Sequence, residues 1–361
     1  KINNSENDLD KDGKESSNIA FNNIYKFHKN QVFNSKKIET TSGVICWQEK
    51  RAIENVGLYI PGGTAPLFSS VLMLAIPAMI ANCKNIVLCS PPNDKGELHP
   101  AILYCAKLCK VNKVICVGGA QSIAAMSIGT ESVPKVNKIF GPGNQFVTKA
   151  KELVQQEGIA IDMPAGPSEV LIIADDTANP EFVAADLLSQ AEHGADSQVL
   201  LLSTSEYIIE SVFKALDVQL AELPRKEIAS AALKNSAAVL CRDIETCMDL
   251  SNAYAPEHLI LASDNAEQWL DLVGNAGSVF VGNYSCESAG DYASGTNHTL
   301  PTNGMARSYS GVSLDSFVRK ITFQKLNAEG IQNIGPAIEL MAEAEELIAH
   351  KNAVSIRLKK L

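Results

Sequence analysis

Short apolar runs rich in β-branched residues recur along the chain, and a stretch with helical spacing separates each run from the next. Strands that are apolar on both faces and joined by helices are typical of parallel sheets with helices on either side. The sequence therefore predicts an α/β fold, and so many strands indicate more than one sheet. The predicted strands are NIVLCSP (85–91), KVICVGG (113–119), NKIFGPG (137–143), VLIIADD (170–176), QVLLLST (198–204), HLILAS (258–263) and GSVFVG (277–282).

Segments rich in glycine and proline suggest where this α/β chain divides. YIPGGTAP (59–66) and DMPAGPSEV (162–170) bracket residues 59–167, which we expect to form an inserted, doubly wound, Rossmann-like domain. Residues 1–58 and 168–312 would then make up a second doubly wound domain, the main one.

The two ends of the chain differ from its middle. The polar residues 1–18 are expected to be loosely held, with a helix from IAFNNIYKFHKNQ onward that places Ile24 and Phe27 on one face. Residues 313–361 are rich in alanine and glutamate, which predicts a C-terminal helical arm with no strand before AVSIRL.

The bulk properties argue against several classes of protein. The 361 residues carry a net charge of −10 with no basic cluster, so we expect neither a nucleic-acid nor a membrane partner. The longest apolar run, Ser70 to Ala81, is interrupted by Pro77 and is too short to cross a bilayer. No signal peptide is visible. The nine cysteines contain no CxxC pair, which favours reduced thiols in a cytoplasmic protein over disulfides or a thiolate zinc site.

A polar pair ends the helix that is predicted to begin at Asn179-Pro180. Gln190 and His193 lie three residues apart, just before Gly194, so their side chains would share a helix face. Taken alone, such a pair is more often a capping or solvated feature than a metal site.

The segment ESAGDYASGTNHTLPT (287–302) strengthens the metal hypothesis. It has too few apolar residues to be core, and a long polar loop is costly to order without a ligand. It supplies Asp291 and His298 as ligands or as groups that support ligands.

Glu257 and His258 precede the predicted strand HLILAS. On extended backbone, neighbouring side chains point opposite ways, so the two residues would serve different tasks. An ordinary surface Glu-His dipeptide is the commoner explanation, but a carboxylate beside an imidazole suits proton transfer at neutral pH.

Two glycine-containing turns each connect a predicted strand to a helix. VGGAQS (117–122) and FGPGNQF (140–146) could present backbone N–H groups to a phosphate at a helix N-terminus. Each alone is a weak signal, and the two together modestly favour a dinucleotide.

Several long motifs together resemble the histidinol dehydrogenase family, by texture the bacterial enzymes. In chain order they are GLYIPGGTAPLFSSVLM, FGPGNQFVTKAK, DMPAGPSEVLIIAD, DLLSQAEHGADSQ, APEHL, ESAGDYASGTNH and HKNAVSIR. The resemblance implies a homodimeric oxidoreductase of histidine biosynthesis, with one zinc ion per subunit, that uses NAD to oxidise L-histidinol to L-histidine through the aldehyde.

The resemblance also implies the residues of the site, which fall into four groups. The implied zinc ligands are Gln190, His193, Asp291 and His350. The implied catalytic pair is Glu257 and His258. The implied substrate contacts are Ser168, Gln190, His193, His258, Asp291, Glu345 and His350. The implied NAD contacts are Tyr59, Gln121 and Asn144, in the 59–167 domain. The resemblance further implies that the 313–361 arm carries Glu345 and His350 into the neighbouring subunit's pocket.

The chain departs from the family's pattern in two places. Cys286 stands where family members commonly have proline, which affects the stiffness of the loop but no ligand. Members also usually carry several dozen further N-terminal residues.

A ligand set of amide, imidazole and carboxylate without sulfur is typical of an open, catalytic zinc site. Histidinol has an imidazole nitrogen and an amine that could chelate such an ion, so we expect zinc to position substrate. We assign proton removal to His258 and the activation of water, for an aldehyde hydrate, to Glu257. A thiohemiacetal is the alternative, disfavoured because Cys116 is expected to be buried and Cys286 lacks a neighbouring base. A zinc hydrolase and a non-catalytic binding module are the alternatives outside this reaction.

Overall fold

The structure is a computed structural model that describes residues 9–32, 36–62, 67–164 and 166–361. It divides into two compact units. The first comprises Lys1–Gln31 and Ile53–Phe317, and the second comprises Val32–Ala52 and Val318–Leu361. Among the described residues, no helix combines the length and apolarity needed to cross a membrane.

Five parallel strands of the first unit form one sheet, in the order β5-β4-β3-β6-β7. They are β3 (Asn55–Tyr59), β4 (Asn85–Ser90), β5 (Lys113–Cys116), β6 (Lys138–Phe140) and β7 (Ala160–Ile161). The helices that cover this sheet are α2 (Lys11–Lys29), α3 (Ser69–Ile80), α4 (Pro100–Leu108), α5 (Gly119–Ile128) and α6 (Gln145–Gln156).

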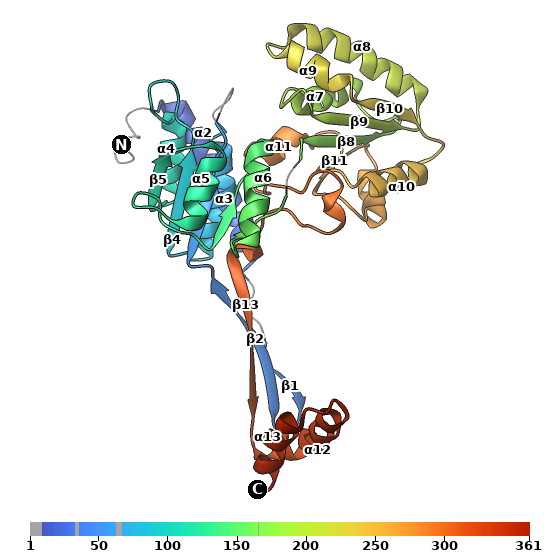
Figure 1. Cartoon of the computed structure of the whole chain (residues 1–361). Helices are drawn as coiled ribbons and strands as arrows, with labels where there is room; N and C mark the ends of the chain where they lie inside the picture. Colours follow the sequence, from blue (N-terminus) through green and yellow to red (C-terminus); the bar gives the residue numbers. More distant parts are fainter. Residues whose placement is uncertain (1–8, 33–35, 63–66, 165) are drawn as a thin grey trace. The chain divides into compact units, whose positions relative to one another are not determined.

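Alternate residues of β4 enter two separate cores. Ile86 and Leu88 pack with residues of α2, α3 and α4, whereas Val87 and Cys89 pack with residues of α5 and α6. Because successive side chains of a strand point to opposite faces, helices cover both faces of the sheet (Figure 1).

A second parallel sheet in the same unit has the order β10-β9-β8-β11-β12. Its strands are β8 (Glu169–Ala174), β9 (Gln198–Ser203), β10 (Ala237–Leu240), β11 (His258–Ala262) and β12 (Ser278–Val281). The helices around it are α7 (Pro180–Ala191), α8 (Glu206–Glu222), α9 (Lys226–Leu233), α10 (Ile244–Tyr254), the 3-10 helix η2 (Ala266–Leu272) and α11 (Glu287–Tyr292). Along β8, Val170 and Ile172 face α7 and α8, while Leu171 and Ile173 face α10 and η2.

All seven predicted strands are present, and the α/β fold with more than one sheet is confirmed. Three strands of the parallel sheets were not predicted, β3, β7 and β10, and each is short or interrupted by small residues. The division into 1–58 with 168–312, 59–167 and 313–361 stays a prediction.

The N-terminal helix begins earlier than its apolar residues indicate. Asp10 caps α2 by accepting a hydrogen bond from the N–H of Gly13, 2.7 Å from Oδ1, so residues 11–18 are helical rather than loosely held. Ile24 and Phe27 lie three residues apart on α2, as expected, but only Ile24 enters the core and Phe27 is exposed. Residues 1–8 lie outside the described part of the chain.

The second unit contains an antiparallel sheet that was not expected. It consists of β1 (Ile38–Thr41), β2 (Val44–Ala52) and β13 (Val318–Leu326), followed by α12 (Ala328–Ala344) and α13 (Ile348–Leu358). All nine residues of β13 pair with β2, and Trp47 stacks on Phe323 with ring centroids 5.4 Å apart.

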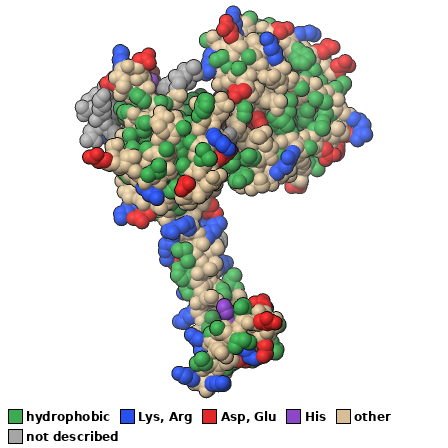
Figure 2. All heavy atoms as spheres, in the orientation of Figure 1, with side chains coloured by type: hydrophobic (Ala, Val, Ile, Leu, Met, Phe, Trp, Pro, Cys, Tyr) green, Lys and Arg blue, Asp and Glu red, His purple; other side chains and the backbone are tan. Residues whose placement is uncertain are grey.

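The helical prediction for this part of the chain is therefore wrong at two places. Residues 318–326 form a strand, and AVSIRL (353–358) belongs to α13. The strand escaped prediction because most of its side chains are exposed and Lys and Arg side chains gather along this sheet, so it lacks an apolar run (Figure 2).

Candidate active site

The predicted catalytic and ligand residues of the first unit gather at the amino ends of the strands of the second sheet. His258 is the first residue of β11, and Glu169 is the first residue of the neighbouring β8. Helix α7 runs back from β8 and carries Gln190 in its last turn. Ligands of open α/β sheets usually bind at the carboxyl ends of the strands, so this site lies at the opposite edge.

The side chains of Glu257 and His258 lie next to each other rather than on opposite sides of the strand, which corrects the expectation from extended backbone. Glu257 lies in the bend before β11, and its Oε2 is 3.6 Å from Nδ1 of His258. The backbone of Glu169 holds both side chains, because its N–H donates to Oε2 of Glu257 over 2.9 Å and its carbonyl lies 3.0 Å from Nδ1 of His258. Both side chains are buried.

The surroundings of each imidazole fix its tautomer. A carbonyl oxygen can only accept, so Nδ1 of His258 carries a hydrogen and Nε2 is left as the proton acceptor. Nε2 is buried, has no hydrogen-bond partner among the described residues and lies 3.8 Å from Oδ1 of Asp291. His298 has the same arrangement at Nδ1, 3.0 Å from the carbonyl of Asp291, but its Nε2 is occupied by Ser70 Oγ at 3.1 Å. Of His258 and His298, His258 is therefore the one whose Nε2 has no hydrogen-bond partner among the described residues.

Side chains with metal-binding atoms surround this nitrogen. One donor atom each from His193, Glu287 and Asp291 lies within 4.8 Å of the other two. Glu287 and Asp291 are four residues apart on α11 and so share a face. The amide of fully buried Gln190, oriented to satisfy its surroundings, donates to both oxygens of Glu287, with 3.1 Å from nitrogen to Oε2.

Buried carboxyl groups crowd the site. Burial raises the pKa of Glu257 to about 7 and that of Asp186 to about 6, and raises the pKa of Glu287 well above its usual range. Burial also disfavours a charged His258, but the carboxylates of Glu257 and Glu287 outweigh it and raise the pKa of His258 to about 10. Carboxyls that resist ionisation beside an imidazole that gains a second proton mark a site short of positive charge, and a cation held there would lower the pKa of His258 and free its Nε2. The amide, imidazole and carboxylate groups present here fit a divalent cation.

The remaining predicted residues of the site have different surroundings. His193 follows the end of α7 and is exposed. Its backbone N–H donates to the backbone carbonyl of Gln190 over 3.2 Å. Ser168 is partly buried directly before Glu169. Glu345 and His350 lie in the second unit, where both are exposed, so their part in the site stays a prediction.

The residues expected to contact NAD lie at the carboxyl end of the first sheet. Tyr59 ends β3, and its hydroxyl accepts a hydrogen bond from the N–H of Gly119 over 3.2 Å, at the start of α5. Gln121 is exposed in the first turn of α5. Asn144 caps α6 by accepting from the N–H groups of Phe146 and Val147, both at 3.1 Å, so a structural role already explains it.

Sequence reasoning missed two buried carboxylates and misjudged one thiol. Glu287 and Glu169 were not singled out, although each is adjacent to or within a motif that supplied other site residues. The spacing of Glu287 four residues before Asp291 could have revealed it. Cys116, expected to be buried, is exposed at the end of β5. Because Cys116 is exposed, the argument from burial against a thiol mechanism does not hold.

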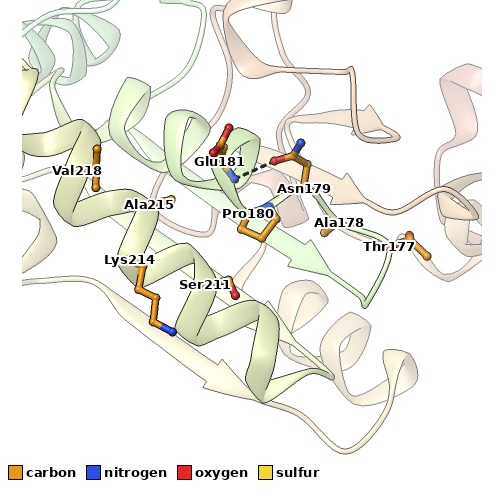
Figure 3. Close-up of a pocket in the computed structure, with 9 residues that line it drawn as sticks. All are labelled: Thr177, Ala178, Asn179, Pro180, Glu181, Ser211, Lys214, Ala215 and Val218. Atoms are coloured by element: carbon orange, nitrogen blue, oxygen red, sulfur yellow. Dashed lines mark hydrogen bonds between the residues drawn. The ribbon is translucent and has the colours of Figure 1, made fainter.

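A hollow of about 780 Å³ lies away from this site, at the amino end of α7, whereas Gln190 is at the carboxyl end (Figure 3). It is lined by Thr177, Ala178, Asn179, Pro180, Glu181, Ser211, Lys214, Ala215 and Val218. Figure 3 shows Asn179 accepting a hydrogen bond from the N–H of Glu181, over 2.9 Å, which is the cap of α7. None of these nine lining residues is among the residues predicted for the site.

Comparison with known proteins places this geometry in a family. The model of the histidinol dehydrogenase family matches residues 1–358. The chain belongs to the histidinol dehydrogenase family. A histidinol dehydrogenase of Bacteroides thetaiotaomicron is 62% identical over 343 residues, which are 95% of this chain and 80% of that protein. The chloroplastic histidinol dehydrogenase of Arabidopsis thaliana is 53% identical over 98% of this chain and 77% of its own.

Solved structures agree with this membership. The crystal structure of histidinol dehydrogenase from Elizabethkingia anophelis matches with a TM-score of 0.98 and 62% identity, covering 99% of this chain and 83% of that one. An acetylating aldehyde dehydrogenase from Geobacillus thermoglucosidasius matches with a TM-score of 0.56 at 15% identity, covering 84% and 82%. That second likeness concerns the fold alone.

Proposed function

We propose that this chain is a zinc- and NAD-dependent histidinol dehydrogenase, which oxidises L-histidinol to L-histidine through L-histidinaldehyde in the final steps of histidine biosynthesis. The observation that carries the proposal is Nε2 of His258, buried and without a partner among the described residues, beside a cluster of metal-binding side chains. Membership of the family supports the substrate. A cytoplasmic location is part of the proposal, and the nine free cysteines are compatible with it.

Gln190, His193 and Asp291 would hold the zinc together with His350. When bound, the zinc supplies a positive centre that two nitrogens of histidinol can chelate, which fixes the carbinol carbon. Ser168 and Glu345 would complete the contacts to the substrate. Tyr59, Gln121 and Asn144 would contact NAD, which when bound accepts a hydride in each of the two oxidations.

His258 would remove the proton of the substrate hydroxyl in the first oxidation. Its Nε2 has no hydrogen-bond partner among the described residues and would be the basic nitrogen once a bound cation lowers the pKa of His258. The carbonyl of Glu169 holds the opposite nitrogen, so that the ring cannot turn away. Glu257 would take a proton from water, which then adds to the aldehyde carbon and gives the hydrate for the second oxidation. The N–H of Glu169 fixes the Glu257 carboxylate for that task.

The appearance of NADH from histidinol and NAD, with and without prior removal of zinc, tests this function. We expect two NADH per histidinol and no turnover after the metal is removed. Zinc-dependent turnover of a substrate in the absence of NAD would indicate a hydrolase. Binding of a ligand without any turnover would indicate a binding module.

A thiol mechanism is the second candidate, because Cys116 is exposed and aldehyde dehydrogenases share the fold. It requires that one cysteine be essential for aldehyde oxidation, whereas the hydrate mechanism requires Glu257. Measuring aldehyde oxidation in Cys116→Ala and in Glu257→Gln separates the two mechanisms.

A homodimer with shared sites is also part of the proposal. Glu345 and His350 are exposed in the second unit, and α12 and α13 expose apolar side chains that a second copy could cover. These side chains are Leu340, Met341, Ile348 and Ile356. Mixing inactive His350→Asn with inactive Glu257→Gln should restore activity in mixed dimers. Two folded, dimeric variants that give no recovery would rule out the shared pocket.

A further inference from the structure

Gln190 and Glu287 form a buried pair between two short helical segments. Gln190 comes from the last turn of α7 and Glu287 from the first turn of α11, and their exposed fractions are 0% and 1%. In the orientation that gives both ends of the amide a suitable partner, the nitrogen of Gln190 donates to both carboxyl oxygens of Glu287.

The two ends of an amide differ in what they can bind. The oxygen can coordinate a cation, whereas the NH₂ group can only donate hydrogen bonds and would repel one. A buried glutamine can be turned either way at little steric cost, so its neighbours decide which end faces the metal. Both carboxyl oxygens of Glu287 face the Gln190 nitrogen as hydrogen-bond acceptors, so Glu287 selects the NH₂ end.

We infer that Glu287 is a positioning residue that makes Gln190 a metal ligand, because it holds the NH₂ group and leaves the amide oxygen to the cation. This inference rests on the proposed zinc site. It assigns Glu287 a hydrogen-bonding role, although its carboxylate also lies with His193 and Asp291 within reach of one ion. Direct ligation by Glu287 is the alternative that the experiment must separate.

Exchanging the two groups tests the inference. In Glu287→Gln the carboxylate is lost, so the Gln190 amide is no longer held in one orientation, and we expect zinc affinity to fall about 10- to 100-fold. In the double variant Gln190→Glu/Glu287→Gln, a carboxylate at 190 can bind zinc while the amide at 287 donates to it. We expect its zinc affinity to return to within about threefold of the unmodified chain.

Zinc affinity would be measured on the whole 361-residue chain by competition with a chromophoric chelator, which requires no turnover. Glu181→Gln makes the same chemical change on an exposed residue at the other end of α7 and should leave affinity unchanged. Circular dichroism of the metal-free variants would show whether each one folds.

Each outcome decides a different question. If the unmodified chain binds no zinc, the proposed function fails rather than this inference alone. If it binds zinc and Glu287→Gln binds equally well, the inference is wrong. If both the single and the double variant are folded and equally weak, Glu287 is itself a ligand. An exchange variant that does not fold also contradicts the inference, since the same hydrogen bonds should form.

Discussion

Lys151 allows a direct test of how the turn before α6 is held. Its side chain is buried, with Nζ 2.5 Å from Oδ1 of Asp162 and 2.8 Å from the carbonyl of Gly141. Asp162 also accepts hydrogen bonds from the N–H of Gly141, 2.7 Å from Oδ2, and from that of Met163, 2.8 Å from Oδ1. Removing one partner of a buried ion pair costs about 3–5 kcal/mol.

The structure predicts that the two halves of this pair are unequal. Lys151→Met leaves a carboxylate that keeps two backbone donors, so we expect a loss near the lower end, about 3 kcal/mol of the free energy of unfolding. Asp162→Asn leaves the buried ammonium of Lys151 without a counter-charge. It also places the NH₂ group of the new amide against groups that can only donate, so we expect a loss of about 5 kcal/mol of the free energy of unfolding.

Urea unfolding followed by far-ultraviolet circular dichroism measures these losses. Lys149→Met is the matched control, because Lys149 lies on the same helix and pairs with Glu152 at 2.9 Å with side chains 69% and 39% exposed. We expect that control to cost less than about 1 kcal/mol. Equal losses in Lys151→Met and Lys149→Met would refute the argument, as would a milder loss in Asp162→Asn than in Lys151→Met.

Three further predictions concern the proposed chemistry. Because burial raises the pKa of Glu257 to about 7, its carboxylate forms only as the pH rises through that value, so aldehyde oxidation should fall below about pH 7. Glu257→Gln should remove that limb of the pH–rate profile and lower the rate about 10²- to 10⁴-fold, and an unchanged limb would contradict the assignment. Cys116→Ala should change aldehyde oxidation by less than about twofold, and a complete loss would support the thiol mechanism instead. Removing zinc should abolish turnover and leave the far-ultraviolet spectrum nearly unchanged, because the described strands are paired through their own backbones; a large spectral change would show that the metal supports the fold.

The fold was predictable where strands are buried on both faces. The strand 170–176 and its neighbours are continuous apolar runs, because helices cover both sides of each sheet. β13 lacks such a run, since its stability comes from nine pairs with β2, a segment more than 250 residues away in sequence. The local sequence pattern contains no information about that pairing, so the antiparallel sheet of the second unit could not be predicted.

The site was predictable only in part, for a similar reason. Gln190 and His193 share a helix end, and their spacing alone suggests a common target. The choice between His258 and His298 as the free base depends on Ser70, which lies on α3 in another part of the chain. Likewise, Glu169 matters through its backbone N–H and carbonyl, which a sequence motif cannot reveal.

The polar segment after α11 shows how such a site is ordered by the chain itself. It was expected to be a long loop that needs a ligand, yet residues 287–292 are helical, and Asn297 and His298 are hydrogen-bonded to α3. Asn297 donates to the carbonyl of Met73 over 2.6 Å, and Ser70 donates to Nε2 of His298, whose Nδ1–H meets the carbonyl of Asp291. Burial lowers the pKa of His298 and so keeps it neutral, as these two hydrogen bonds require. The backbone of Asp291 is therefore held, through His298, by Ser70 on α3, a helix that covers the first sheet. The carboxylate of Asp291 faces His258, at the start of β11 in the second sheet. A hydrogen bond to the backbone carbonyl of Asp291 thus links this residue of the proposed metal site to a helix that covers the first sheet.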